Sequence, residues 1–556
     1  MSDGHAPRSG GQVLVDALTV HGVDTVFCVP GESYLAVIDA LRDAPSIRTI
    51  VCRHESGAAF MAEAYGKLTG RPGVLLVTRG PGACNASVGV HTAFQDSTPM
   101  VVLIGQVARH TEYREAFQEL DYHAFYGPLT RWVAQVDDPA RLPELMSQAF
   151  HRACGGRPGP VALSLPEDAL RQSVRVADTD PYKVVEPAAG AADMAAMRRA
   201  LASSRKPLVI VGGGGWSPRA CDDLRRFVEA ANLPVLASFR CQDRMDNTHR
   251  NYVGELGISV APKLAQRIRE ADLVLCIGAR LGEQSTREYS LLVPPCPSQA
   301  LVHVYPDPGE LGRVYQADLP ICAGVASFTA AAADLEPVDD GAWRQWTAGA
   351  RADFEEQLAR TPPAGELDMA RVVAHLAGRL PPEAIITTDA GNFSGWPQRF
   401  YPFRRFPSQL GPTNGAMGYG VPAAVAARLV HPDRPVVCFV GDGGALMTGQ
   451  ELATAVHHGV DPVVIIVNNN AYGTIRMHQE RDYPGRVHAT DLTNPEFAVW
   501  AKSFGAFGEV VTRTEDFPEA FERALGAGRA AVLELRLPIE AISARMTLTA
   551  LRESSR

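Results

Sequence analysis

The amino-acid sequence predicts an α/β protein made of three doubly wound, parallel-sheet domains. Short continuous runs of Val, Ile and Leu recur along the chain, and segments with helical periodicity lie between them. Such alternation is typical of βαβ units and of parallel sheets. Two polar stretches interrupt the pattern, and the length of 556 residues also favours more than one domain.

The predicted strands are uniformly apolar, which is typical of strands that are buried on both faces of a parallel sheet. We expect them at residues 25–29, 74–78, 100–105, 208–211, 273–277, 436–440 and 463–467. Helical patterns lie between them, for example at residues 56–68 and 449–458. A strand, a turn rich in glycine and a helix thus form the repeating unit.

Two stretches without strand-like runs are predicted to connect the domains. Residues 174–190 are polar and rich in Asp, Pro and Gly, while residues 337–367 are charged and contain a Thr-Pro-Pro-Ala-Gly run. The predicted domains therefore cover three ranges, 1–175, 190–336 and 366–545. The residues that follow Ala544 resemble a tail.

Composition argues against several classes of function. The net charge of -9 and the lack of a Lys/Arg cluster argue against nucleic acid as a partner. No apolar run approaches the ~20 residues that span a membrane, and the polar start lacks the apolar segment of a secretory signal. The ten cysteines form no CxxC pair, so we expect reduced thiols and a cytoplasmic protein.

A predicted metal site lies at the ends of two strands in the last domain. Asp442 follows the strand at 436–440 within a Gly-Asp-Gly-Gly turn, and Asn469 follows the next strand within Asn-Asn-Asn. One βαβ crossover joins the strands, so their carboxyl ends meet at one edge of the sheet. The side-chain oxygens of Asp442 and Asn469 are ligands of the kind that Mg²⁺ prefers. The glycines leave room for phosphate groups to approach the backbone. A plain βα turn is the alternative for the first motif alone.

This pattern resembles the signature of thiamine-diphosphate enzymes, in which Gly-Asp-Gly precedes Asn-Asn by one helix and one strand. The resemblance implies Asp442, Asn469 and the backbone carbonyl of Ala471 as ligands of Mg²⁺. It implies that Met417 is the apolar residue beneath the bent cofactor, where an ordinary core Met is the alternative. The other cofactor-binding residues that it implies in this domain are Gly391, Asn392, Phe393, Gly415, Gly441, Gly443, Gly444, Tyr472, Gly473 and Thr474.

The first domain resembles the pyrimidine-binding domain of the same enzymes, with the central domain next and the diphosphate-binding domain last. Glu55 begins a helix of small residues, where an acid is also favoured by the helix dipole. The resemblance implies that Glu55 hydrogen-bonds the aminopyrimidine and promotes formation of the ylide. It also implies Pro30, Gly31 and Asn85 as cofactor-binding residues. The presence of Glu55 argues against a non-catalytic binding protein.

Motifs along nearly the whole chain resemble acetolactate synthase large subunits, among them VPGESYLAVIDAL, TRGPGACNA and EAFQELD. This resemblance implies carboligation of pyruvate to 2-acetolactate, with Gln118 facing the substrate and Phe117 nearby. It implies a homodimer or homotetramer with active sites between subunits, and it identifies no regulatory subunit. His478 and Glu167 depart from the Trp and Lys of that family. A 2-oxo acid decarboxylase and an acyl-CoA lyase of the oxalyl-CoA type therefore remain alternatives.

FAD is a further cofactor that acetolactate synthases often bind in the central domain. The turns at residues 212–215 and 278–280 are compatible with FAD, although a glycine-rich turn is weak support. Tyr305 and Gly324 stand where that family usually has acidic residues. The sequence thus leaves FAD binding open.

Aromatic 2-oxo acid decarboxylases are another related class. They have histidines in the stretch where this sequence has Thr78 and no His.

Overall fold

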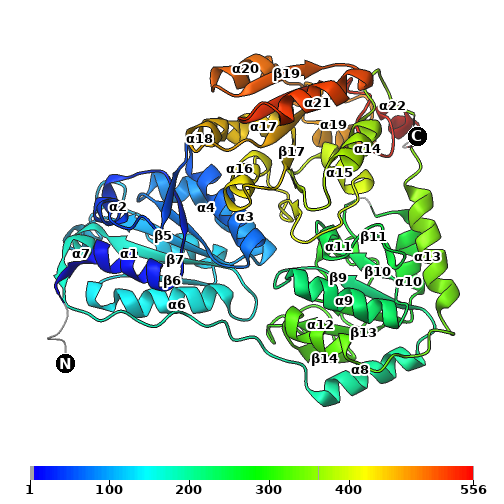
Figure 1. Cartoon of the computed structure of the whole chain (residues 1–556), viewed down its shortest axis with the longest axis horizontal. Coiled ribbons are helices and arrows are strands. Elements are labelled where there is room, and N and C mark those ends of the chain that lie inside the picture. The colour runs from blue at the N-terminus through cyan, green and yellow to red at the C-terminus, as the bar shows by residue number, and fades with distance from the viewer. Residues whose placement is uncertain (1–5, 259, 361, 555–556) are drawn as a thin grey trace.

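The computed structural model describes residues 6–258, 260–360 and 362–554. The remaining residues, which include part of the polar start and one residue of the second predicted connector, lie outside this description. Three six-stranded sheets form the described chain (Figure 1), and every strand pair within them is parallel. A small antiparallel pair joins β1 (Arg8–Ser9) to β8 (Ser173–Val174). The three predicted parallel-sheet domains are therefore confirmed.

The first sheet has the strand order β3-β2-β4-β5-β7-β6. Alternate strand residues face opposite sides: Val26 and Val74 pack on the core under α1, α2 and α6, while Phe27 and Leu75 pack on the core under α3 and α4. The strands are β2 (Thr25–Cys28), β3 (Arg48–Val51), β4 (Gly73–Val77), β5 (Met100–Gln106), β6 (Trp132–Gln135) and β7 (Pro160–Pro166). The helices are α1 (Gly10–Val20), α2 (Leu35–Arg42), α3 (Glu55–Thr69), α4 (Pro81–Asp96), α5 (Tyr122–Tyr126), α6 (Leu142–Cys154) and α7 (Glu167–Arg171).

The central sheet has the order β11-β10-β9-β12-β13-β14. Its strands are β9 (Pro207–Val211), β10 (Val235–Ala237), β11 (Tyr252–Glu255), β12 (Leu273–Ile277), β13 (Ala300–Tyr305) and β14 (Leu319–Cys322). Its helices are α8 (Ala191–Ser203), α9 (Pro218–Ala230), α10 (Pro262–Glu270), α11 (Glu283–Thr286), α12 (Val325–Ala333) and α13 (Arg344–Gln357).

The third sheet has the order β16-β15-β17-β18-β20-β19, so β17 and β18 are neighbours as predicted. Its strands are β15 (Ile385–Thr388), β16 (Gln409–Leu410), β17 (Val436–Gly441), β18 (Val463–Asn468), β19 (Phe507–Val511) and β20 (Ala531–Arg536). Its helices are α14 (Met369–Arg379), α15 (Gly395–Phe400), α16 (Gly420–Val430), α17 (Asp442–Thr448), α18 (Leu452–His457), α19 (Gly473–Asp482), α20 (Phe497–Ser503), α21 (Phe517–Leu525) and α22 (Leu548–Ser554).

Three local predictions need correction. The helix predicted at 449–458 begins earlier, at Asp442, and a 3-10 turn at Gly449–Glu451 divides it, where Gly449 lies against the ring of Trp500. The second connector is not free of regular structure but contains α13. The buried Trp343, just before this helix, holds it on the central domain through a hydrogen bond from Nε1 to the carbonyl of Ala231 (3.0 Å). The predicted tail contains α22, which packs against α19.

The first and third domains share one hydrophobic core. Helices α3 and α16 pack against each other, and Figure 1 shows them side by side between the two sheets. Their contact includes the rings of Phe60 and Tyr419, whose centroids lie 5.5 Å apart. The two domains are thus joined within one chain. Among the described residues, no helix combines the length and apolarity needed to cross a membrane.

Candidate functional site

The predicted metal ligands meet at the carboxyl edge of the third sheet. Gly441 is paired with Val467 in the β17–β18 register, so the residues after both strands leave the sheet side by side. The backbone N–H of Ala471 donates to Oδ2 of Asp442 and to Oδ1 of Asn469, at 3.2 Å each. The structure therefore brings together the carboxylate, the amide and the Ala471 backbone.

Asp442 is also held by a residue that sequence reasoning missed. Nδ2 of Asn494 donates to Oδ2 of Asp442 (2.8 Å) and to the amide oxygens of Asn468 and Asn470 (3.1 Å each). Asn494 lies outside the recognised motif, in a loop before α20, so no local signal marks it. It joins the two strand ends into one polar cluster.

The donor set fits a small hard cation. Asp442 is only 3% exposed, and burial raises the pKa of its carboxyl group while bonds from Asn494 and backbone N–H groups lower it. A buried carboxylate is costly without a positive partner. Mg²⁺ prefers oxygen ligands of the kinds that Asp442, Asn469 and a backbone carbonyl offer. Among the described residues, no group of three or more His, Cys, Asp and Glu side chains is arranged to hold a metal ion.

Close backbone approaches surround this cluster. A Cβ atom on Gly443 would lie 2.6 Å from the ring of Tyr472, and one on Gly441 would lie 2.9 Å from the ring of Phe393. Gly391, at φ 154°, is approached by the same Phe393 ring. These glycines are therefore required by packing, whatever they also do for a ligand.

The start of α19 contacts the loop after β15. Asn392 accepts the Thr474 hydroxyl through its Oδ1 (3.2 Å) and donates its backbone N–H to Thr474 Oγ1 (3.0 Å). Its Nδ2 also donates to the carbonyl of Gly473 (3.4 Å). Asn392, Gly473 and Thr474, which are predicted to bind the cofactor, therefore lie together at the ends of neighbouring segments.

Met417 lies in a turn that a buried acid holds. Asp389 is fully buried and accepts the backbone N–H groups of Gly418 (2.7 Å) and Gly420. The pKa of Asp389 is raised to about 6, because the effect of burial outweighs the hydrogen bonds from Gly418 and Gly420 and the charge of Arg240, which lower this pKa. Asp389 also crowds Gly444, since a Cβ atom there would lie 2.3 Å from Oδ2. The sequence did not single out Asp389, because its role depends on a loop far along the chain.

The first domain forms a second cluster around Glu55. Glu55 is the first residue of α3 and is 8% exposed, and Oε2 accepts Nδ2 of Asn85 (3.0 Å). A Cβ atom on Gly82 would lie 3.2 Å from Oε1 of Glu55 and 2.8 Å from Thr78. Gly31, which follows Pro30, packs against the same Thr78. The residues predicted here therefore share the carboxyl edge of the first sheet.

Gln118 lies beside this cluster, on the loop that follows β5. Its backbone has φ 66°, and a Cβ atom on Gly80 would lie 2.6 Å from the Gln118 carbonyl. The neighbouring Phe117 is 73% exposed. Gln118 thus lies over the turn that leads into α4, the helix that carries Asn85.

Within one chain, the two clusters remain separate. The Glu55 carboxylate accepts a hydrogen bond from Asn85 of its own domain, and the Asp442 carboxylate accepts hydrogen bonds from Ala471 and Asn494 of the third domain. A different residue, the fully buried Glu451, links the domains by accepting the backbone N–H groups of Arg53 and His54 at 3.0–3.2 Å. Glu451 was also missed, since its partners lie in another domain.

The two departures from the acetolactate synthase pattern occupy different places. Glu167 pairs with the buried Arg79 (3.2 Å), which also pairs with Glu32 (2.9 Å). Glu167 is thus part of an ion-pair cluster at the edge of the first sheet. His478 is half-buried on α19, the helix that also carries Thr474.

A large pocket lies where the three domains meet. Its volume is about 810 Å³, within the range of cofactor sites. Its walls include the turn 213–215 after β9, and Arg157, Arg280, Tyr305 and Gly324. The linker Glu186 accepts the backbone N–H of Ala326 (3.2 Å) and fills the space beside Gly324, so that a carboxylate lies there although residue 324 is not acidic. The sequence did not single out Glu186.

Comparison with known families covers the three domains in turn. The N-terminal TPP binding domain of thiamine pyrophosphate enzymes matches residues 8–125, the central domain of these enzymes matches 194–332, and their C-terminal TPP binding domain matches 389–535.

Curated relatives match nearly the whole chain. The acetolactate synthase large subunit of Parasynechococcus marenigrum is 35% identical, over 92% of this chain and 85% of the relative. The acetolactate synthase isozyme 2 large subunit of Escherichia coli is 31% identical, over 93% and 94%. The acetolactate synthase large subunit of Lactococcus lactis is 31% identical, over 90% of this chain and 87% of the relative. The chain therefore belongs to the thiamine pyrophosphate enzymes and is an enzyme similar to acetolactate synthase large subunits.

Proposed function

We propose that the protein uses thiamine diphosphate and Mg²⁺ to decarboxylate pyruvate and to join the remaining two-carbon unit to a second pyruvate, giving 2-acetolactate. The observation that carries this proposal is the convergence of Asp442 Oδ2 and Asn469 Oδ1 on one backbone N–H, in a protein of this family. The names of the relatives support acetolactate as the product.

The residues of the third domain would bind the diphosphate end of the cofactor. Asp442, Asn469 and the carbonyl of Ala471 supply the oxygen ligands for Mg²⁺, which neutralises the phosphates. The N–H groups at the start of α17 lie beside this metal site and favour an anion. Asn494 keeps the carboxylate of Asp442 oriented toward the ion.

The residues of the first domain would act on the other end of the cofactor. When bound, thiamine diphosphate would supply a carbon nucleophile and an electron sink for decarboxylation. Glu55 would exchange a proton with a ring nitrogen of the aminopyrimidine, and Asn85 fixes the orientation of the Glu55 carboxylate. Gln118 would face the 2-oxo acid from the loop above Gly80.

Two copies of the chain are needed to complete the site in this proposal. Glu55 and Asp442 lie in separate clusters of one chain, whereas one cofactor must contact both. Large apolar side chains are exposed near both edges: Leu35 (54%) and Phe117 (73%) in the first domain, and Leu446 (45%) and Met447 (44%) in the third. Exposed apolar patches favour association. We therefore propose a homodimer, or a tetramer made of two such dimers.

The direct test is incubation of the purified protein with pyruvate, thiamine diphosphate and Mg²⁺. We expect release of CO2 together with 2-acetolactate, at a rate that falls when Mg²⁺ is chelated. CO2 with acetaldehyde as the sole organic product would replace the carboligase by a simple decarboxylase. Size-exclusion chromatography with light scattering tests the dimer, and a monomeric active enzyme would overturn the shared site.

A second candidate function is a decarboxylase of another 2-oxo acid, or a lyase for a 2-hydroxyacyl-CoA or oxalyl-CoA. It is favoured by His478 and by Glu167, which pairs with Arg79, because these residues depart from the Trp and Lys of the acetolactate synthase pattern. A panel of 2-oxo acids and acyl-CoA thioesters decides between the candidates. If pyruvate were the only compound of the panel that is turned over, the second candidate function would be rejected.

FAD in the interdomain pocket is a further part of the proposal. The pocket has room for a dinucleotide, its glycine turn permits close approach, and Arg157 and Arg280 provide positive charge. The Nε atoms of Arg240 and Arg244, which also line it, are buried and lack a partner among the described residues. Mass spectrometry of the native protein with a visible spectrum tests this, and a colourless protein without flavin would reject it.

The cytoplasm is the compartment that we propose. All ten cysteines are free, and five of them are buried. Free thiols are typical of proteins in a reducing compartment such as the cytoplasm. Cell fractionation tests this assignment, and recovery of the protein from an extracellular or periplasmic fraction would contradict it.

A further inference from the structure

The loop of residues 411–420 carries Gly415 and Met417, the residues that we propose to lie beside the cofactor. No atom lies within 4 Å of the place where a Cβ atom on Gly415 would stand, and Met417 is half-buried. This side of the loop is open. The other side is fixed by bonds to distant parts of the chain, which are described next.

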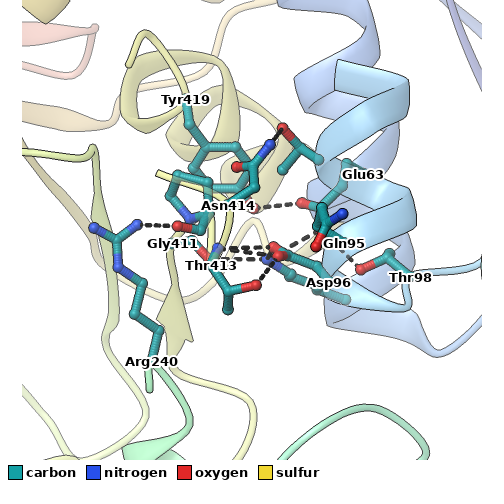
Figure 2. Close-up of polar contacts among 12 residues, drawn as sticks. Glu63, Gln95, Asp96, Thr98, Arg240, Gly411, Thr413, Asn414 and Tyr419 are labelled. Atoms are coloured by element: carbon teal, nitrogen blue, oxygen red, sulfur yellow. Dashed lines mark hydrogen bonds and ion pairs between the residues drawn. The ribbon is translucent and has the colours of Figure 1, made fainter. Parts of the chain in front are cut away.

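The first domain holds the loop at three points (Figure 2). Lys67 Nζ donates to the carbonyl of Gly411 (2.9 Å), Asp96 accepts the backbone N–H (3.0 Å) and the hydroxyl of Thr413, and Glu63 Oε2 accepts the hydroxyl of Tyr419 (2.6 Å). We call Glu63, Lys67, Asp96, Thr413 and Tyr419 the interdomain clasp. Glu63 and Lys67 lie on α3 and Asp96 ends α4, so the clasp joins the helices of one domain to a loop of another.

The clasp contains charged groups, and two of its members are fully buried. Glu63 and Tyr419 are 0% exposed, and Lys67 pairs with Glu63 (3.0 Å) and with Asp96. Burial lowers the pKa of Lys67, but Asp96 and Glu63 outweigh burial and raise the pKa above its usual value, so the ammonium is charged. The hydroxyl of Thr98 donates to Glu63 (2.8 Å) and completes the set of partners.

The third and central domains hold the same loop from the other side. Asp389 accepts the N–H groups of Gly418 and Gly420 on either side of Tyr419. Arg240 donates to the carbonyls of Pro412 (2.6 Å) and Asp389 (2.9 Å). Met417 thus lies between two segments of the loop that hydrogen bonds hold in place, one at Pro412 and Thr413 and the other at Gly418 and Gly420.

The interdomain clasp is not needed merely to hold the first and third domains together. The apolar contact of α3 with α16 already joins them, and buried ion pairs give little net stability relative to apolar packing. Directional bonds instead fix the position of the groups that they join. We propose that the interdomain clasp positions Met417 under the cofactor, and that its members are positioning residues for the active site. This inference rests on the proposed function, which gives Met417 its role.

The test compares Tyr419→Phe and Thr413→Val with the wild-type enzyme. Each variant removes one hydroxyl of the clasp and keeps the size of the side chain, so the Phe60–Tyr419 ring contact can persist. Arg48→Met is the matched control, because Arg48 also joins the two domains, by a bond to the carbonyl of Leu429 (3.2 Å), but it does not touch the loop.

We expect the dissociation constant for thiamine diphosphate to rise, and kcat to fall, about tenfold in both variants, since each loses a bond to a carboxylate. The KM for pyruvate should stay within about twofold, because Gln118 lies outside the loop. Hydrogen–deuterium exchange of residues 411–420 in the cofactor-free protein should become faster in both variants. The control should match the wild type in all of these measurements.

The outcomes separate this inference from the proposed function. A wild-type protein that does not bind thiamine diphosphate would remove the proposed function itself. A wild type that binds and turns over, with variants that lose only thermal stability and keep the same dissociation constant and kcat, would overturn the clasp. Should Tyr419→Phe not fold, Thr413→Val decides alone, because Thr413 is only half-buried.

Discussion

The C-terminal helix α22 packs against α19 and is also joined to it by an ion pair between the buried Glu480 and the partly exposed Arg552, and the loss of this pair has a calculable cost. Glu480 of α19 is 0% exposed, and its two oxygens accept Nε (2.7 Å) and Nη2 (2.5 Å) of Arg552. Arg476 (3.2 Å) and the backbone N–H of Gly485 (3.1 Å) are the other donors. We therefore choose Arg552→Met as the perturbation, because it keeps the length of the side chain and removes the charge.

The expected magnitude follows from the pKa of Glu480. The bonds from Arg552 are the largest cause that lowers this pKa from 4.5 to about 2. A carboxyl group whose pKa is lower in the folded state stabilises that state above its unfolded pKa, and this stability is lost as the pH falls through the folded pKa. The difference between 4.5 and about 2 corresponds to about 3 kcal/mol. Because the Arg552 side chain is 37% exposed, solvent weakens the pair, and because Arg476 and Gly485 stay in place, removal of Arg552 should cost about 2 kcal/mol of this difference at pH 7.

Hydrogen–deuterium exchange of the α22 amides measures this cost, because it reports the local opening of one helix. At pH 7 the variant should exchange about 30-fold faster than the wild type after correction for intrinsic rates. The difference should shrink by about half at pH 3, since the pH has then fallen between the two pKa values. Arg379→Met is the control: its bidentate pair with Glu522 is exposed (43% and 49%), so the cost should be below about 1 kcal/mol. An equal difference at pH 7 and pH 3, or none at pH 7, would refute the reasoning.

Three further predictions concern the active site. Glu55→Gln should lower kcat with pyruvate by at least about 100-fold while the dissociation constant for thiamine diphosphate changes little; unchanged turnover would remove Glu55 from catalysis. Asp442→Asn should weaken cofactor binding by at least about 100-fold at fixed Mg²⁺ in calorimetry, with partial recovery at high Mg²⁺, and an unaltered affinity would show that the ion is held elsewhere. Gly82→Ala should reduce kcat, because its Cβ atom would lie 3.2 Å from Glu55 and 2.8 Å from Thr78; wild-type kinetics would mean that Glu55 tolerates this displacement.

The sequence by itself determined the fold class and the local part of the site. Uniformly apolar runs such as residues 273–277 became β12 (Leu273–Ile277), because strands buried on both faces leave a signal that is independent of the rest of the chain. The positions of Asp442 and Asn469 were predictable for a related reason: a single crossover joins β17 to β18, so few arrangements of their ends are open.

Only the tertiary structure showed the residues whose partners lie far along the chain. Glu451, Asp389 and the clasp residue Glu63 carry no local pattern, since a buried acid is identified by such partners. Asn494 carries no local pattern either, because the carboxylate of Asp442 to which it donates lies 52 residues away in the sequence. The sequence predicts a tail after Ala544 for the same reason, because the partner of Arg552 in its ion pair, Glu480, lies 72 residues away. Hydrophobic periodicity is a property of neighbouring residues, whereas burial of a charge depends on which distant groups fold around it.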